Sequence, residues 1–327
     1  MRSTKKEDVL PLRFSGKYFG DEETLMRIRL ISGTCYIAVL VLAFCLKIFI
    51  PNPYGDFCFD ILTYAFALIG TFEMLRALKE KTTFSERVLV VAFSAITIPV
   101  CAICEVYFKG YGGGMLAVSG CLAALVLALL LLLIINHKET TLESLGMSLL
   151  AAVYPTLLLV LLVIINHTAG DAELAKFALN SDIMILFVFV ITPFADSLAY
   201  VFGRFLRKYF SKKLAPELSP NKTVIGFIGG LVGGAVGATA LYFIYNAIVG
   251  SFAQMYIWLP VYIGIAMLTA VATALGDLVE SCIKRKLNIK DMGKLMPGHG
   301  GILDRIDGVL FAAVAVYLCF SVIFMIV

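Results

Sequence analysis

The feature that most constrains this chain is a succession of long apolar segments along almost its whole length. Each is about 20 residues long, enough to cross a membrane as an α-helix. Hydrophobic residues make up 60% of the 327 positions and charged residues only 15%, too few for the surface of a soluble protein of this size. Strand-length alternation of apolar and polar residues is missing, which argues against a membrane β-barrel. We therefore predict an all-α polytopic membrane protein.

The apolar segments predict about nine transmembrane helices. Their expected positions are 30–50, 57–77, 88–108, 115–136, 144–166, 183–203, 224–249, 256–280 and 305–327. The chain then divides into an N-terminal tail at 1–29, N-terminal transmembrane helices at 30–180 and a C-terminal catalytic region at 181–327. Cytoplasmic loops at 203–223 and 281–304 belong to the last of these.

Lysine and arginine residues indicate the orientation, because short cytoplasmic loops carry an excess of them. Residues 1–29 are charged before any apolar segment begins, which predicts an uncleaved cytoplasmic tail. The loops after the second, sixth and eighth segments are basic, whereas 51–56, 167–182 and 250–254 are poor in basic residues. These alternate connections predict a cytoplasmic N-terminus and a C-terminus on the other side of the membrane.

Cysteine and histidine residues give no sign of a metal site. Most of the eight cysteines lie in apolar segments, and the pair Cys101 and Cys104 has no second pair of ligands, so we interpret them as small apolar residues. The three histidines are too scattered for a zinc site.

A charged stretch at 276–308 separates the last two apolar segments. Asp277, Glu280, Ser281 and Lys284 fall on one face of a helix. Asp304 and Asp307 share a face at the start of the last helix, so joining the two helix ends would bring three aspartates together. Carboxylates repel one another unless a cation lies between them, and oxygen ligands suit Mg²⁺. The alternative is that these charges only anchor the helix ends at the membrane surface.

Two other segments carry candidate site residues. Asp196, Tyr200 and Gly203 share a helical face, and a carboxylate inside an apolar helix is costly and usually functional. A structural hydrogen bond would also explain Asp196. Ser219 and Lys222 precede a glycine-rich segment and could bind phosphate, although this segment lacks the P-loop pattern and could be an ordinary basic loop.

The glycine-rich segment and Glu73 each allow two interpretations. The glycines at 226–237 are typical of close helix packing, with the alternative that Gly226 lets the backbone approach a phosphate. Glu73 could pair with Arg76 at a helix end or belong to the site.

Taken together, these segments resemble the signature of phosphatidate cytidylyltransferases, also called CDP-diacylglycerol synthases. The resemblance covers about 180–310 and rests on DSLAYVFGR at 196–204, SPNKT at 219–223, SCIKR at 281–285, KD at 290–291, PGHGG at 297–301 and DRID at 304–307. One departure is Ile225, where members of the family often carry an acidic residue.

The resemblance implies roles for individual residues. The catalytic set is Lys284, Asp304, Arg305 and Asp307, with Arg305 as a charge clamp, and the metal ligands are Asp277, Asp304 and Asp307. The residues implied in substrate binding are Asp196, Tyr200, Ser219, Lys222, Ser281, His299, Gly300 and Gly301. Among them, Ser219 and Lys222 would bind the CTP phosphates, Ser281 and Lys284 would lie near the phosphates, and the residues at 299–301 would line the nucleotide.

The resemblance also implies a reaction. The cytidylyl group of CTP would be transferred to phosphatidic acid, releasing pyrophosphate and forming CDP-diacylglycerol for phospholipid biosynthesis. Mg²⁺ is the expected cofactor, with room for a second cation. We expect a homodimer among membrane lipids, no nucleic-acid partner, a bacterial inner membrane and an active site on the cytoplasmic side.

Two alternatives remain open on the sequence. A transporter or lipid flippase would carry acidic residues nearer the centre of the membrane and broken helices in paired halves. A related enzyme that acts on a prenyl lipid, such as a CDP-archaeol synthase or a polyprenol kinase, would keep the metal and the nucleotide but change the acceptor.

The predicted orientation can be tested at the C-terminus. A tag after Val327 should be labelled by a membrane-impermeant reagent from outside intact cells, because an odd number of spans places the two ends on opposite sides. Labelling only after the cytoplasmic face is opened would contradict the orientation.

Overall fold

Helices dominate the structure. The computed structural model of the chain describes residues 22–108, 112–168, 180–249 and 255–326. Within these residues nine helical segments are long and apolar enough to cross a membrane, which confirms the predicted architecture. The elements are α1 (Glu22–Phe49), α2 (Tyr54–Ala77), α3 (Phe84–Tyr107), α4 (Gly113–Ile135), α5 (Leu142–Ala152), the π-helix η1 (Val153–Leu157), α6 (Leu158–His167), α8 (Ser181–Phe205), β1 (Lys213–Ala215), β2 (Ser219–Thr223), α9 (Val224–Val249), α10 (Met255–Lys286) and α11 (Leu303–Ile326).

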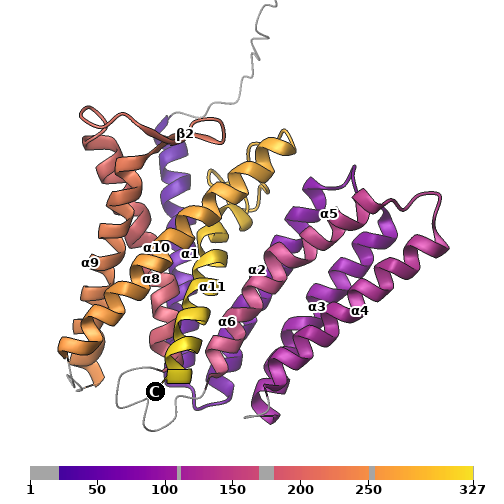
Figure 1. Ribbon diagram of the computed structural model, residues 1–327, viewed down its shortest axis with the longest axis horizontal. Helices are drawn as coiled ribbons and strands as arrows, with labels where there is room; N and C mark the ends of the chain where they lie inside the picture. Colours follow the sequence, from indigo (N-terminus) through magenta and orange to yellow (C-terminus); the bar gives the residue numbers. More distant parts are fainter. Residues whose placement is uncertain (1–21, 109–111, 169–179, 250–254, 327) are drawn as a thin grey trace, which may run out of the picture.

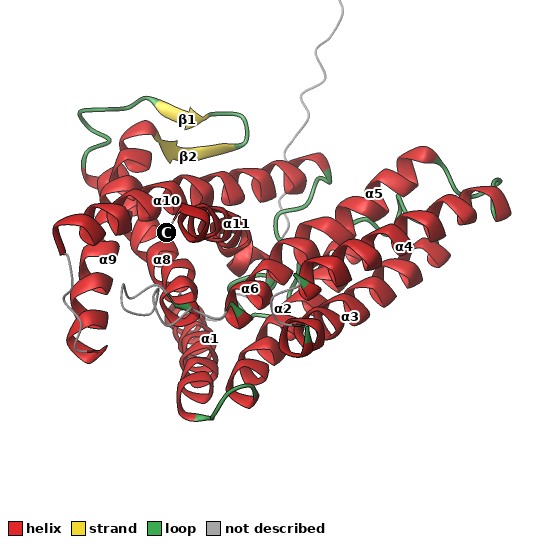
Figure 2. Ribbon diagram, turned by 60° about the horizontal axis from the view of Figure 1, so that its bottom comes forward, coloured by secondary structure: helices red, strands yellow, loops and turns green. Residues whose placement is uncertain are grey.

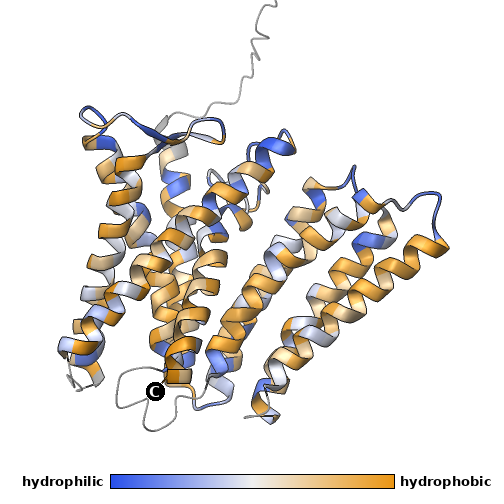
Figure 3. Cartoon of the chain, in the orientation of Figure 1, coloured by the Kyte–Doolittle hydropathy of each residue, from blue (hydrophilic) through white to orange (hydrophobic). Residues whose placement is uncertain are grey.

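The helices form two groups that meet along α2, α6 and α11. In Figure 1, α8, α9, α10 and α11 lie together on one side, while α3, α4 and α5 lie on the other. Helices α5, η1 and α6 make one continuous span, and η1 contains Pro155, which has no N–H to donate to a regular α-helical ladder. The long helix surfaces are apolar, and hydrophilic residues gather at the helix ends and connections (Figure 3).

Glycines set the close packing of α9 against its neighbours. A Cβ atom on Gly233 would lie 2.5 Å from the backbone oxygen of Phe194 on α8, and one on Gly234 would lie 2.8 Å from the backbone oxygen of Ala266 on α10. A Cβ on Gly226 would lie 3.0 Å from the backbone oxygen of Ala199. Small residues let helix backbones approach in a membrane, so the packing interpretation of these glycines is favoured.

A buried polar cluster joins four helices at the end of the bundle near Lys47. The Nζ atom of Lys47 lies 2.7 Å from Oδ1 of Asp56 and 3.2 Å from Oδ1 of Asp182. Beside this pair, Nε2 of His167 lies 2.6 Å from Oδ2 of Asp60. Charges in an apolar environment are stable only when paired, so this cluster fixes the ends of α1, α2, α6 and α8 relative to one another.

At the other end of the bundle, the structure extends several predicted elements. Helix α1 begins at Glu22, inside the predicted tail, and α10 continues to Lys286, inside the predicted loop at 281–304. Among the charged residues of these extensions, Lys284 pairs with Glu280 and Asp304. The predicted loop at 203–223 contains a two-stranded antiparallel hairpin over the ends of α8 and α9 (Figure 2), a feature that the sequence analysis missed.

The basic connections share this end of the bundle, as the predicted orientation requires. Which end faces the cytoplasm stays a prediction. The first 21 residues and Val327 lie outside the described residues.

The glycine packing can be tested with two matched substitutions. Gly233→Ala should destabilise the protein by about 1–3 kcal/mol, because the new Cβ meets backbone atoms that cannot rotate away. Gly264→Ala, on the same bundle, meets no atom within 4 Å and should be neutral or slightly stabilising. Thermal unfolding in detergent compares the two variants; equal melting temperatures would contradict this account of the packing.

Candidate active site

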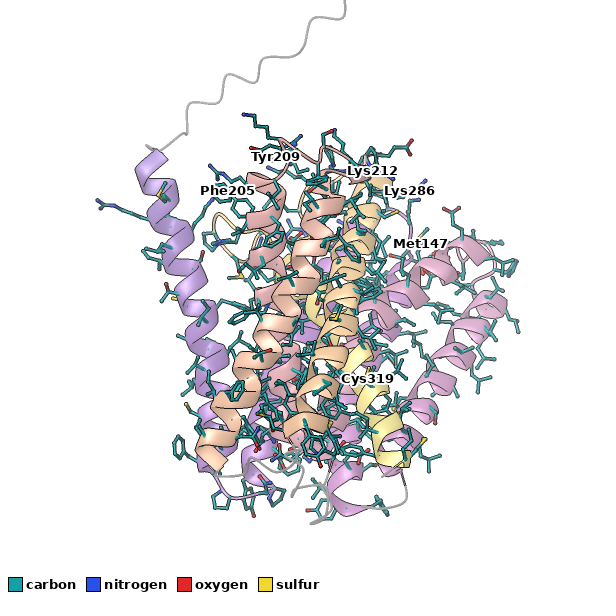
Figure 4. The ribbon with its side chains drawn as sticks, turned by 60° about the vertical axis from the view of Figure 1, so that its left-hand side comes forward. Met147, Phe205, Tyr209, Lys212, Lys286 and Cys319 are labelled. Carbon is teal, nitrogen blue, oxygen red and sulfur yellow. The ribbon has the colours of Figure 1, made fainter. Side chains whose placement is uncertain are left out.

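The candidate site lies where α10 ends and α11 begins. The segment between them, 287–302, folds back over the end of α2, and the hairpin and the start of α9 approach from the other side. Figure 4 shows Lys212 of the hairpin connection and Lys286 of α10 at this same end of the molecule. Residues far apart in the sequence therefore meet at one pole of the bundle.

Glu73 on α2 holds the start of α11. Its two carboxylate oxygens accept hydrogen bonds from the backbone N–H groups of Ile302, at 3.1 Å, and Leu303, at 2.9 Å. A helix begins with unpaired N–H groups and a partial positive charge, so a buried carboxylate is a strong cap. A Cβ atom on Gly301 would lie 2.4 Å from both carboxylate oxygens, so only glycine allows this approach.

Glu73 is a residue whose place the sequence left open. Arg76, its suggested partner, lies exposed, while Glu73 is 7% exposed. The structure therefore places Glu73 against the start of α11 rather than in a pair with Arg76.

Asp304 organises the segment between the two helices. Its Oδ2 atom accepts from the backbone N–H groups of Gly301, at 2.8 Å, and Met292, at 2.9 Å. Its Oδ1 atom lies 2.9 Å from Nζ of Lys284, which also contacts Oε2 of Glu280 at 2.6 Å. Charge-assisted hydrogen bonds are the strongest kind in proteins, so this carboxylate ties α10, α11 and the segment between them together.

The segment 297–301 is a tight turn. The backbone N–H of Met296 donates to the oxygen of Gly300, and the N–H of His299 donates to the oxygen of Met296. Gly298 and Gly300 have φ angles of 75° and 91°, a region that favours glycine. The Nη2 atom of Arg305 donates to the backbone oxygen of His299 at 2.8 Å.

The environment of His299 disfavours the charged form of its imidazole. Partial burial lowers its pKa below the usual 6.5, and the positive charges of Arg305 and Arg29 lower the pKa further. At neutral pH the ring therefore carries one proton and can act as both donor and acceptor.

A second group of site residues surrounds a cavity of about 580 Å³ between α8, α9, α10 and the hairpin. Lys222 bridges to Asp277, with Nζ 2.6 Å from Oδ2, and the hydroxyl of Ser281 donates to the other oxygen of Asp277 at 3.3 Å. Of the predicted residues, Asp196, Tyr200, Lys222 and Asp277 line this cavity, together with Arg204 and Arg207.

Two hydroxyl residues of the hairpin lie in different places, and of these Ser219 was predicted to bind phosphate. Ser219 pairs with Ala215 across the two strands and is not among the residues that line the cavity. The hydroxyl of Thr223 accepts from the N–H of Gly226 and so caps the start of α9. Lys222 lines the cavity with Leu214, Asn221 and Thr223, and it forms the ion pair with Asp277.

The carboxylates of α10 and α11 form a region of negative charge where the helices cross. A Cβ on Gly276 would lie 2.4 Å from the backbone oxygen of Asp307, so the two helices touch beside Asp277. Glu280 is 1% exposed and its Oε1 atom has no hydrogen-bond partner among the described residues. The carboxylate of Asp307 lies close enough to disfavour a negative charge on Glu280.

This donor set fits a hard cation, because oxygen ligands and an unpartnered buried carboxylate oxygen are what such an ion requires. The side chains are not gathered into a finished metal cage: among the described residues, no group of three or more His, Cys, Asp or Glu side chains has that geometry. The convergence of the three aspartates stays a prediction: Asp304 faces Lys284 and the turn, while Asp277 faces Lys222.

Comparison with known proteins identifies the family. The model of the cytidylyltransferase family matches residues 27–323. The chain belongs to the cytidylyltransferase family. It is 31% identical to the phosphatidate cytidylyltransferase of Bacillus subtilis (strain 168) over 89% of this chain and 96% of that protein. The resemblance drawn from the sequence motifs is thereby confirmed.

Other relatives match shorter parts of this chain. The phosphatidate cytidylyltransferase of Staphylococcus aureus (strain COL) is 43% identical over 39% of this chain and 45% of that protein. The enzyme of the same name from Mycobacterium tuberculosis (strain CDC 1551 / Oshkosh) is 52% identical over 66 residues, which are 20% of this chain and 20% of that protein. The chain thus matches about a fifth of the mycobacterial protein's length.

The contact of Glu73 with the start of α11 generates a prediction. Glu73→Gln keeps the shape but replaces one of two acceptor oxygens by a donor, so one N–H at the start of α11 loses its partner. A hydrogen bond to a charged group contributes about 1.5–3 kcal/mol, so turnover should fall by roughly ten- to a hundredfold. Glu143→Gln is the control, since Glu143 forms an exposed pair with Lys81 at 3.6 Å and should change activity less than twofold. Equal activities of the two variants would contradict the role of the cap.

Proposed function

We propose that this enzyme transfers the cytidylyl group of CTP to phosphatidate, producing CDP-diacylglycerol and pyrophosphate. The full-length similarity to the Bacillus subtilis phosphatidate cytidylyltransferase carries the proposal. A phosphate oxygen of phosphatidate attacks the α-phosphorus of CTP, and the bond from that phosphorus to the pyrophosphate oxygen breaks. Phosphatidate is anionic near neutral pH, so the attacking oxygen needs no general base.

The chain's own residues supply positioning and charge neutralisation, the main requirements of such a transfer. Lys284 and Arg305 are cations at the junction of α10 and α11, held by Asp304 and by the turn at 297–301. They would bind the phosphates of CTP, and Lys222 would add a third positive charge from the hairpin. Arg204 and Arg207 line the cavity beside α8 and offer cations to the phosphate of the lipid.

Mg²⁺ is the proposed cofactor, with Asp277, Asp304 and Asp307 as its ligands and a second cation possible by the same donor chemistry. A bound metal ion would neutralise the charge on the reacting phosphates. The unpartnered oxygen of Glu280 beside Asp307 supports a cation at this junction. Asp304 would need to exchange its contact with Lys284 for the metal.

The location of the reaction is part of the proposal. Basic connections gather at the end of the bundle that carries the site, which supports an active site on the cytoplasmic face of a bacterial inner membrane. CTP is found in the cytoplasm, and the lipid head group lies at the same surface. A homodimer is expected from the family resemblance alone.

The experiment is turnover of radiolabelled CTP by the purified protein in detergent. With phosphatidate and Mg²⁺, label should enter a lipid-soluble product, and removing Mg²⁺ with a chelator should abolish it. Parallel reactions with a diether phosphate lipid and a polyprenol test the alternative acceptors. Transfer to one of those lipids but not to phosphatidate would contradict the proposed acceptor. Incorporation of label into lipid in the absence of Mg²⁺ would contradict the proposed requirement for this metal ion.

Asp304→Asn should lower turnover by about a hundredfold or more, because an amide has one acceptor oxygen for the two N–H groups and Lys284. Asp182→Asn, at the opposite end of the bundle, is the control and should retain activity within about twofold because Lys47 keeps Asp56. Wild-type rates from Asp304→Asn would contradict its assignment to the site.

A further inference from the structure

Helix α1 contacts the turn at 297–301, although it lies at the edge of the bundle. Only 11% of its most apolar stretch is buried, and Figure 4 shows it flanking the other helices. Near its start, the hydroxyl oxygen of Ser32 lies 2.7 Å from Nδ1 of His299 and donates toward the backbone oxygen of Pro297 at 3.2 Å. Neither the sequence motifs nor the proposed reaction assigns a role to this contact.

The neighbours of Ser32 fit closely around the same turn. A Cβ atom on Gly33 would lie 3.8 Å from Cε1 of His299, in ordinary contact. The side chain of Arg29 lies against Gly298, where a Cβ atom would be 2.9 Å from Cγ of Arg29. Three consecutive residues of the turn therefore contact one side of α1, so the interface consists of several contacts and not of one hydrogen bond alone.

The hydrogen bonds open to Ser32 favour a proton on one nitrogen of His299. The Ser32 hydroxyl has one proton, which it can donate to the backbone oxygen of Pro297, at 3.2 Å, or to that of Arg29, at 3.1 Å. When the hydroxyl donates to one of these oxygens, its contact with His299 is a hydrogen bond only if Nδ1–H is the donor and the hydroxyl oxygen the acceptor, so the Nδ1–H form makes two hydrogen bonds where the other form makes one. In a neutral ring, Nε2 becomes a bare acceptor, and it has no partner among the described residues.

We propose that Ser32 is a positioning residue that holds His299 in the Nδ1–H form, so that Nε2 accepts a hydrogen bond from an N–H or O–H group of the nucleotide. This inference rests on the proposed function. The exocyclic amine of cytosine and the ribose hydroxyls are such donors. A fully ionised phosphate oxygen has no proton to give, so phosphates fall to Lys284 and Arg305 instead.

The first test measures the tautomer directly. The chain has three histidines, so a nitrogen-15 histidine spectrum of the whole protein in detergent can be assigned to His299 with His299→Gln. The wild-type protein should show protonated Nδ1 and unprotonated Nε2 at pH 7.5, and Ser32→Ala should shift the balance toward protonated Nε2. A wild-type ring with its proton on Nε2 would overturn the proposal, whether or not the enzyme is assayed.

The second test separates the two substrates. Ser32→Ala should raise KM for CTP about fivefold, the effect of one neutral hydrogen bond, and leave KM for phosphatidate unchanged. Ser32→Thr keeps the hydroxyl and should restore KM for CTP. Thr34→Ala is the matched control on the same helix, because its hydroxyl bonds only to the backbone oxygen of Leu30 in the described structure.

The outcomes distinguish this inference from the proposed function. An unchanged KM for CTP in Ser32→Ala, or an equal rise in both KM values, would overturn the positioning role while the reaction itself stands. Absence of any cytidylyl transfer by the wild-type protein would overturn the proposed function, and the tautomer measurement would still decide whether Ser32 orients His299.

Discussion

The contact between Glu73 and the start of α11 is the interaction on which the rest of the site depends. The first N–H groups of a helix have no partners within that helix, and an apolar environment offers no water to replace them. Glu73 supplies a buried carboxylate from α2, and Gly301 leaves room for it. This cap connects the N-terminal helices to the C-terminal ones. By holding the start of α11, it also holds Asp304 and the turn at 297–301 in position.

At both ends of the bundle, carboxylates are paired with basic side chains. At the site end, Lys284 and Lys222 each hold a carboxylate of α10, with Lys284 also bonded to Asp304. At the other end, Lys47 and His167 pair with aspartates of α2. The difference is that the site end leaves Glu280 with an unpartnered oxygen and a cavity beside it, whereas the aspartates at the other end are paired. An excess of carboxylate oxygens is what makes the site end suited to a cation.

Much of this arrangement could be predicted from the sequence. Transmembrane helices depend on local hydropathy, so their number and approximate positions follow from the chain alone. The i, i+3 and i+4 spacing placed Asp277, Glu280 and Lys284 on one face for the same local reason. Contacts between distant segments leave no such periodic signal. The cap by Glu73, the hairpin at 213–223 and the contact of Ser32 with His299 were therefore missed or left open.

The sequence by itself determined the class of protein, its helices and the motif residues that identify its family, because each depends on residues close together in the chain. Only the tertiary structure decided which of those residues meet. It paired Lys222 with Asp277, assigned Asp304 to the turn, used Thr223 as a cap and brought α1 against His299. These pairings depend on how the helices cross and how closely they pack. The glycines at 226–237 and the buried ion pairs determine that packing through contacts between segments that are distant in the sequence.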